Sequence, residues 1–160
     1  MEDAADGGER EWHRFGAEAI ERRMLETLGA HLGARLRPRT ITLDDGNRAE
    51  IEGVDAGETV IVQLMGNLGA FKPQYRNKAI ADMFKLEWMR RAVFPGALPV
   101  LCVTDAVARI FTPTAWTTSA ARDLGIDVLV YRETEGEASV VEPLISRVEP
   151  ADGVYRAETP

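Results

Sequence analysis

Two β-type segments, a glycine-bearing loop and a long basic helix follow one another within residues 48–91, and this order most constrains the fold. Residues 49–55 and 59–65 are rich in β-branched side chains and are joined through Asp-Ala-Gly-Glu, which predicts an antiparallel hairpin. Pro73 suits the first turn of a helix, where its missing N–H costs no hydrogen bond. This helix is expected to bury an apolar stripe at helical spacing, formed by Ile80, Met83, Phe84 and Trp88.

The size and composition of the chain predict a single domain with one core. Its 160 residues are 45% hydrophobic. No apolar run approaches the ~20 residues that a membrane-spanning helix needs, and the first ten residues are acidic where a signal peptide would be basic. We therefore expect no membrane association. Cys102 has no second cysteine to pair with, so we expect a buried thiol in a reducing cytoplasm. The chain has only this cysteine and two histidines, which are too few for a structural zinc site with four such ligands.

Charge is distributed unevenly along the chain. The formal net charge of −7 argues against a protein that coats nucleic acid over its whole surface. From Arg132 to the end, seven acids stand against three arginines. Residues 71–91 hold only two acids, Asp82 and Glu87, and six cations: Lys72, Arg76, Lys78, Lys85, Arg90 and Arg91. The sequence therefore predicts a basic patch on an acidic protein.

The remaining segments extend the element order to α-β-β-β-α-β-α-β. We expect a disordered acidic stretch over 1–8, a helix over 9–35, strands over about 39–43, 48–55 and 58–65, the basic helix over 73–94, a buried strand over 98–105, a broken helical region over 105–124, a strand over 126–132 and a last helix over 138–148. The first helix is expected to bury Trp12, Phe15, Ile20, Met24, Leu28 and Leu32.

An antiparallel meander followed by helical crossovers to buried strands implies a mixed α/β fold, with a mixed central sheet flanked by helices on both faces. We place this domain at 9–132 and an acidic C-terminal extension at 133–160. Gly29 and Gly33 are costly inside a helix, so they indicate close packing of the first helix against another backbone.

A set of local motifs accompanies this order. The residues that carry it are Glu52-Gly53-Val54, Val62-Gln63, Gly66 and Gly69 with Lys72, then Gln74, Lys78, Asp82, Lys85 and Leu86, and later Trp116 and the strand Gly-Ile-Asp-Val-Leu-Val. Together they resemble small bacterial proteins of the restriction-endonuclease-like fold, the PD-(D/E)XK nuclease superfamily, whose core is α-β-β-β-α-β. The resemblance covers about residues 24–131.

The resemblance implies a metal-dependent phosphodiesterase site. In that family an acid on the second strand, and an acid plus a lysine on the third, hold divalent ions that activate water and neutralise charge on phosphate. Here it implies Mg²⁺, with Glu52 as principal ligand and with Gln63 and Glu50 as further ligands. The third-strand acid is replaced by Gln63 and the lysine by Met65, so Lys72 or Lys78 would have to supply the positive charge.

Strand register tests this arrangement. If the hairpin loop runs from Ala56 to Thr59, Glu52 stands opposite Gln63 on one face, and Glu50 faces Met65. A slip of one residue would move these side chains to the other face of the sheet.

Each of these residues also has a structural interpretation. Glu50 and Glu52 can be solvated carboxylates, and Gln63 a hydrogen-bonded amide in an apolar strand. Lys78, Asp82 and Lys85 share one helical face, either as solvated ion pairs or as contacts to a phosphate or a partner. Lys72 and Arg76 flank the helix start, where N–H groups favour anions. On the first helix, Glu18 and Glu21 are either charged surface or an acid of the metal site.

Three functions remain open. The first is a Mg²⁺-dependent nuclease that uses Glu52, Gln63 and a relocated lysine. The second, which we favour, is a nuclease-like domain kept as a non-catalytic or weakly active module for binding nucleic acid through the basic helix, or a protein, and assembling as a homodimer. It predicts a sizeable apolar surface patch or a homodimer interface. The third, a small-molecule enzyme, lacks a Gly-x-Gly-x-x-Gly, Walker or Gly-x-Ser-x-Gly motif.

Overall fold

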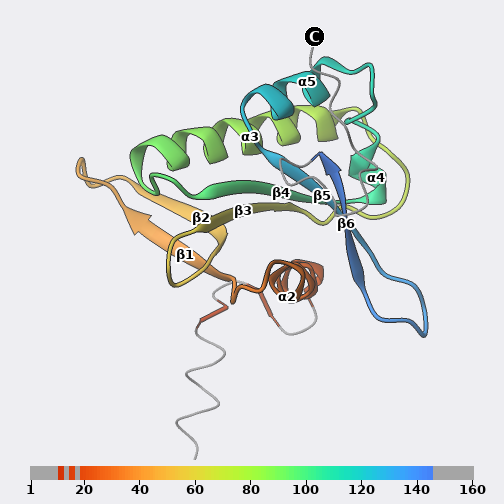
Figure 1. Cartoon of the computed structure of the whole chain (residues 1–160), viewed down its shortest axis with the longest axis horizontal. Helices are drawn as coiled ribbons and strands as arrows, with labels where there is room; N and C mark the ends of the chain where they lie inside the picture. The colour runs from red at the N-terminus through yellow and green to blue at the C-terminus, as the bar shows by residue number, and fades with distance from the viewer. Residues whose placement is uncertain (1–10, 13–14, 17–18, 146–160) are drawn as a thin grey trace, which may run out of the picture.

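The computed structural model describes residues 11–12, 15–16 and 19–145, and within them it is a mixed α/β fold built on a six-stranded sheet (Figure 1). The helices are α2 (Ile20–Leu32), α3 (Gln74–Ala92), α4 (Asp105–Ala108) and α5 (Trp116–Asp123). The strands are β1 (Arg37–Thr42), β2 (Arg48–Val54), β3 (Val60–Met65), β4 (Leu98–Thr104), β5 (Asp127–Arg132) and β6 (Val140–Ile145).

The strands lie in the sheet in the order in which they occur along the chain, β1-β2-β3-β4-β5-β6. The pairs β1–β2, β2–β3 and β5–β6 are antiparallel, whereas β3–β4 and β4–β5 are parallel. Helix α3 connects β3 to β4, and α4 and α5 connect β4 to β5, because parallel neighbours need a crossover. The predicted meander and mixed sheet are confirmed.

Each face of the sheet has its own apolar cluster and its own helix. One cluster joins Ile61, Met65 and Leu101 to Met83 and Leu86 of α3. The other cluster lies on the opposite face, where strand residues such as Val62 and Leu64 pack against Met24, Leu25 and Leu28 of α2. Figure 1 shows α3 and α2 on opposite sides of the sheet, as expected from the sequence. The thiol of Cys102 is buried in the second cluster, and burial raises its pKa to about 12.

The strand β2 contains a β-bulge. Its register against β1 shifts between Arg37 and Arg39, so that Glu52 and Gly53 together lie opposite one residue of β1. A Cβ on Gly53 would lie 2.6 Å from Cδ2 of Leu25 in α2. The missing side chain therefore lets the bulged strand approach α2 closely.

The first predicted helix is shorter than expected and begins at Ile20. Trp12 and Phe15 are buried as predicted, at 3% and 4% exposure, but neither is helical. The guanidinium groups of Arg22 and Arg37 lie 4.6 Å and 3.9 Å from the centre of the Trp12 ring, and these cation–π contacts hold the ring against α2 and β1. The disorder expected for residues 1–8 concerns residues outside the described part of the chain.

The two helical glycines have different roles. A Cβ on Gly29 would lie 2.5 Å from the carbonyl oxygen of Ala34, so a backbone does approach closely there, but it is the chain that leaves α2 and not another element. Gly33 instead ends α2 with a φ of 67°, the left-handed conformation that glycine adopts most easily.

The helix predicted over 138–148 is wrong, because β6 occupies Val140–Ile145 and pairs with β5. Strand β6 lies at the edge of the sheet, where the missing N–H of Pro143 is tolerated. This segment, assigned from sequence to the C-terminal extension, thus adds a strand to the sheet; residues 146–160 lie outside the described part.

The predicted apolar stripe of α3 is partly wrong. Met83 is buried, but Phe84 is 76% exposed and Trp88 is 37% exposed. The face that packs on the sheet is formed by Tyr75, Ala79, Asp82, Met83, Leu86 and Met89. Helix α3 thus has apolar side chains on two faces, and helical spacing alone does not reveal which face meets the sheet.

Within the described residues, no helix is long and apolar enough to span a bilayer.

Candidate functional site

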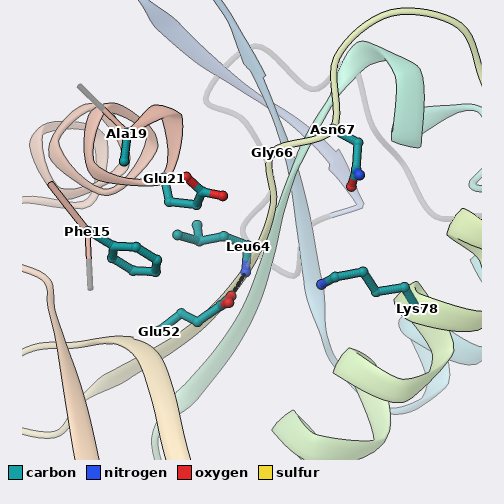
Figure 2. Close-up of a pocket in the computed structure, with 8 residues that line it drawn as sticks. All are labelled: Phe15, Ala19, Glu21, Glu52, Leu64, Gly66, Asn67 and Lys78. Carbon is teal, nitrogen blue, oxygen red and sulfur yellow. Dashed lines mark hydrogen bonds between the residues drawn. The ribbon is translucent and has the colours of Figure 1, made fainter. Parts of the chain in front are cut away.

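A cavity of about 460 Å³ opens between α2, the β2–β3 strands and α3 (Figure 2). Its lining residues are Phe15, Ala19, Glu21, Glu52, Leu64, Gly66, Asn67 and Lys78. Figure 2 shows Glu21 on the α2 side, Glu52 on the strand side and Lys78 extending in from α3. Two of the predicted site residues, Glu52 and Lys78, therefore lie at one cavity.

The cavity forms where β2 and β3 separate. The hairpin has the predicted register, with Gly53 opposite Val62 and Val54 opposite Ile61. Toward Glu52 this pairing ends, which leaves β3 without a partner on that side. The carboxylate of Glu52, which is 8% exposed, fills the gap: its Oε2 accepts a hydrogen bond from the backbone N–H of Leu64 at 2.5 Å.

Gln63 lies beside Glu52, as the predicted register requires. Its Oε1 accepts a hydrogen bond from the backbone N–H of Glu52 at 3.2 Å, and its Nε2 donates one to Oδ1 of Asp82 at 3.3 Å. Nζ of Lys78 lies 2.8 Å from Oδ2 of the same carboxylate. A continuous polar network therefore connects β2, β3 and α3, in which the buried amide of Gln63 is hydrogen-bonded at both ends.

Asp82 is the member of this network that sequence reasoning placed in the wrong environment. Its helical spacing to Lys78 and Lys85 favoured a solvated face, but the residue is 9% exposed and belongs to the sheet-facing side of α3. One signal was available in the sequence: Asp82 stands next to Met83 and three residues after Ala79, both of which are buried.

The structure places Glu50 away from the cavity and Glu21 at it. Glu50 is paired with Thr40 in the β1–β2 ladder and does not line the cavity, and the expected pairing with Met65 is absent from the described β2–β3 register. Glu21, in the first turn of α2, does line the cavity. Glu18, the other acid considered on this helix, lies outside the described residues.

The other predicted cations lie outside the cavity. Lys72 and Arg76 are exposed at the start of α3, and Lys85 is half-buried further along it. In the described part of the chain, none of these three side chains forms an ion pair, whereas Lys78 is paired with Asp82. Of the four cations predicted to contact phosphate or a partner, Lys78 therefore lines the cavity and the other three do not.

The cavity offers few of the oxygen ligands that Mg²⁺ requires. No group of three His, Cys, Asp or Glu side chains in the described ranges is placed to hold a metal ion. Of the expected ligands, only Glu52 lines the cavity, and Oε1 of Gln63 already accepts a backbone N–H. Mg²⁺ commonly takes one or two carboxylates and completes its shell with water, and the carboxylates that line the cavity are those of Glu21 and Glu52.

Compared with protein-family models, with curated proteins and with solved structures, the chain gives no significant match.

Proposed function

We propose that this chain is a restriction-endonuclease-like domain that no longer cleaves nucleic acid and functions as a binding module. The observed order of α2, the β1–β3 meander, α3 and a parallel β4 is the order expected for such a core, which supports the kinship. The position of Glu52 and Gln63 on neighbouring strands supports it as well.

Loss of cleavage is supported by what the third strand carries. Met65 stands where the family places a lysine, and it is fully buried against α3. Gln63 stands where the family places an acid, and its amide is used to join β2 to Asp82. Both positions therefore have a structural role in place of a catalytic one.

The observation that carries the binding function is the outward face of α3, which exposes Phe84 and Trp88 beside cations that have no ion-pair partner within the described residues. Exposed aromatic side chains of this size on a surface helix are typical of interaction sites.

The test combines a cleavage assay with a stability assay on wild type and Glu52→Ala. The full chain is incubated with single- and double-stranded DNA and RNA in the presence of Mg²⁺ or Mn²⁺. We expect no cleavage by either protein and lower stability for Glu52→Ala. Cleavage by wild type that Glu52→Ala abolishes would overturn the proposal.

A second function is favoured by one observation: Glu21, Glu52 and Lys78 line the same cavity. If Mg²⁺ binds there, Glu21 and Glu52 would hold it, and it would neutralise charge on a phosphodiester. The ammonium of Lys78 would then stabilise phosphate oxygens. Calorimetric titration of MgCl₂ into wild type and Glu21→Gln tests this function, which requires binding by wild type and weaker binding by the variant.

A further inference from the structure

The outward face of α3 carries an apolar ridge. Ile80, Phe84 and Trp88 follow one another at intervals of four residues, so they lie along one side of the helix, opposite the face packed on the sheet. The ridge spans about 12 Å, because a helix rises about 1.5 Å per residue. Phe84 is 76% exposed and takes no part in the core, to which the opposite face of the helix contributes.

The charges around this ridge are positive. The acids of α3 do not offset them, because Asp82 is buried and Glu87 is held by Arg90 and Arg91, at 2.5 Å from each. Lys85 and Arg76 flank the ridge, and neither is in an ion pair within the described residues. The ridge therefore lies in a positive local field on a chain whose net charge is −7.

This charge pattern disfavours a second copy of the chain as the occupant. Antiparallel packing of two α3 helices about Phe84 would bring Arg76 of one copy near Arg91 of the other. Like charges placed opposite one another at an interface are unfavourable. Parallel packing would place Lys85 near its own equivalent, with the same result.

Nucleic acid is also a poorer fit than an acidic protein segment. The net charge of −7 opposes the approach of a polyanion, whose binding depends on many phosphate contacts. Ile80 offers no ring on which a base can stack. A ridge of side chains four residues apart is, in contrast, the feature that interdigitates with the ridges of another helix.

We propose that the outward face of α3 docks an amphipathic, acidic helix of a partner protein. Apolar side chains of that helix would pack against Phe84 and Trp88, and its flanking carboxylates would face Arg76 and Lys85. This inference rests on the proposed binding function and adds the chemical class of the partner.

A display selection tests it. A library of helical peptides of about 20 residues, unbiased in charge, is selected against the tagged full chain, with counter-selection on the Phe84→Ala/Trp88→Ala variant. We expect the retained peptides to be more acidic than the input pool and to carry apolar residues at intervals of three and four. The inference would be overturned if the retained peptides were no more acidic than the input pool. It would also be overturned if no retained peptide lost binding to the Phe84→Ala/Trp88→Ala variant.

One retained peptide is then synthesised and its binding measured by fluorescence anisotropy. Phe84→Ala or Trp88→Ala is expected to weaken binding at least about tenfold, as truncated aromatic anchors commonly do. Trp116→Ala is the matched control, since Trp116 is a 61% exposed tryptophan on α5 and should have no effect. Arg76→Ala/Lys85→Ala should weaken binding in ~0.1 M salt and have less effect in ~1 M salt, where charges are screened beyond about 3 Å.

Two further measurements identify rival occupants. If the chain binds a labelled dT20 or RNA oligonucleotide and Trp88→Ala abolishes this binding, the occupant is nucleic acid. If the chain sediments as a dimer and Trp88→Ala dissociates it, the occupant is a second copy of the chain. Either result overturns the inference while leaving the binding module intact. Cleavage of nucleic acid by wild type would overturn the proposed function without affecting the peptide selection.

Discussion

Oε2 of Glu52 lies 2.5 Å from the backbone nitrogen of Leu64, across the point where β2 separates from β3. A side chain of one strand thus supplies the hydrogen bond that the ladder no longer provides to the next strand. The bulge at Glu52 and Gly53 lies at the same point of β2, where the pairing with β3 ends after Gly53. The acid that most resembles a metal ligand is therefore also a structural element of the sheet.

This relationship predicts the effects of two substitutions at Glu52. Glu52→Ala leaves the N–H of Leu64 buried without an acceptor and should lower the free energy of unfolding by about 1–3 kcal/mol. Glu52→Gln keeps an oxygen acceptor and should cost less. Urea unfolding followed by circular dichroism at pH 7 measures both, and equal stability of wild type and Glu52→Ala would contradict this role.

Gln63 and Asp82 are predicted to be energetically coupled. A double-mutant cycle with Gln63→Leu and Asp82→Leu should give an interaction energy of about 0.5–3 kcal/mol, because the two side chains share a buried hydrogen bond. Lys78→Met is the comparison, since its ammonium is half-exposed and its ion pair should contribute about 1 kcal/mol or less. Additive single effects in thermal or urea unfolding would argue against the network.

Gly29→Ala should destabilise the fold although alanine is the better helix former. The new Cβ would lie 2.5 Å from the carbonyl oxygen of Ala34, which is backbone and cannot rotate away. The expected cost is about 1–3 kcal/mol, as for other overpacked sites. Gly57→Ala is the matched control, because its Cβ would meet its nearest neighbour at an ordinary 3.5 Å. Similar melting temperatures for the two variants would refute the predicted clash.

Asp55 should make stability depend on acid pH. Burial raises the pKa of its carboxyl, but hydrogen bonds from the Thr59 hydroxyl and from the N–H groups of Thr59 and Val60 outweigh it, so the pKa lies below its usual value. A carboxyl with a depressed folded pKa contributes stability above its unfolded pKa of about 3.9, and this contribution is lost as pH falls through the folded pKa.

The variant Asp55→Asn tests this dependence. It keeps an oxygen acceptor at the hairpin but does not titrate. Its free energy of unfolding should fall less steeply than that of wild type as pH decreases from about 5 to 3. Urea unfolding at intervals across this range provides the comparison, and parallel curves for the two proteins would show that Asp55 contributes nothing to acid sensitivity.

Local patterns predicted much of the fold correctly. The hairpin register follows from the turn residues and from side-chain alternation, which are short-range properties, and it brought Glu52 beside Gln63. The crossover helix and the buried strands were equally visible. The last strand was missed because its β-branched residues are interrupted by Pro143, which only an edge position tolerates.

The sequence by itself determined the order of the elements, the register of the hairpin and the presence of Glu52 and Lys78 near one site, because turns and side-chain periodicity are local. Only the tertiary structure decided that Asp82 is buried and that Phe84 and Trp88 are exposed. Two apolar faces of one helix satisfy the same periodicity, and the choice between them depends on how their shapes fit the sheet. Because α3 packs with this face on the sheet, Asp82 joins the polar network and the apolar ridge stays on the surface.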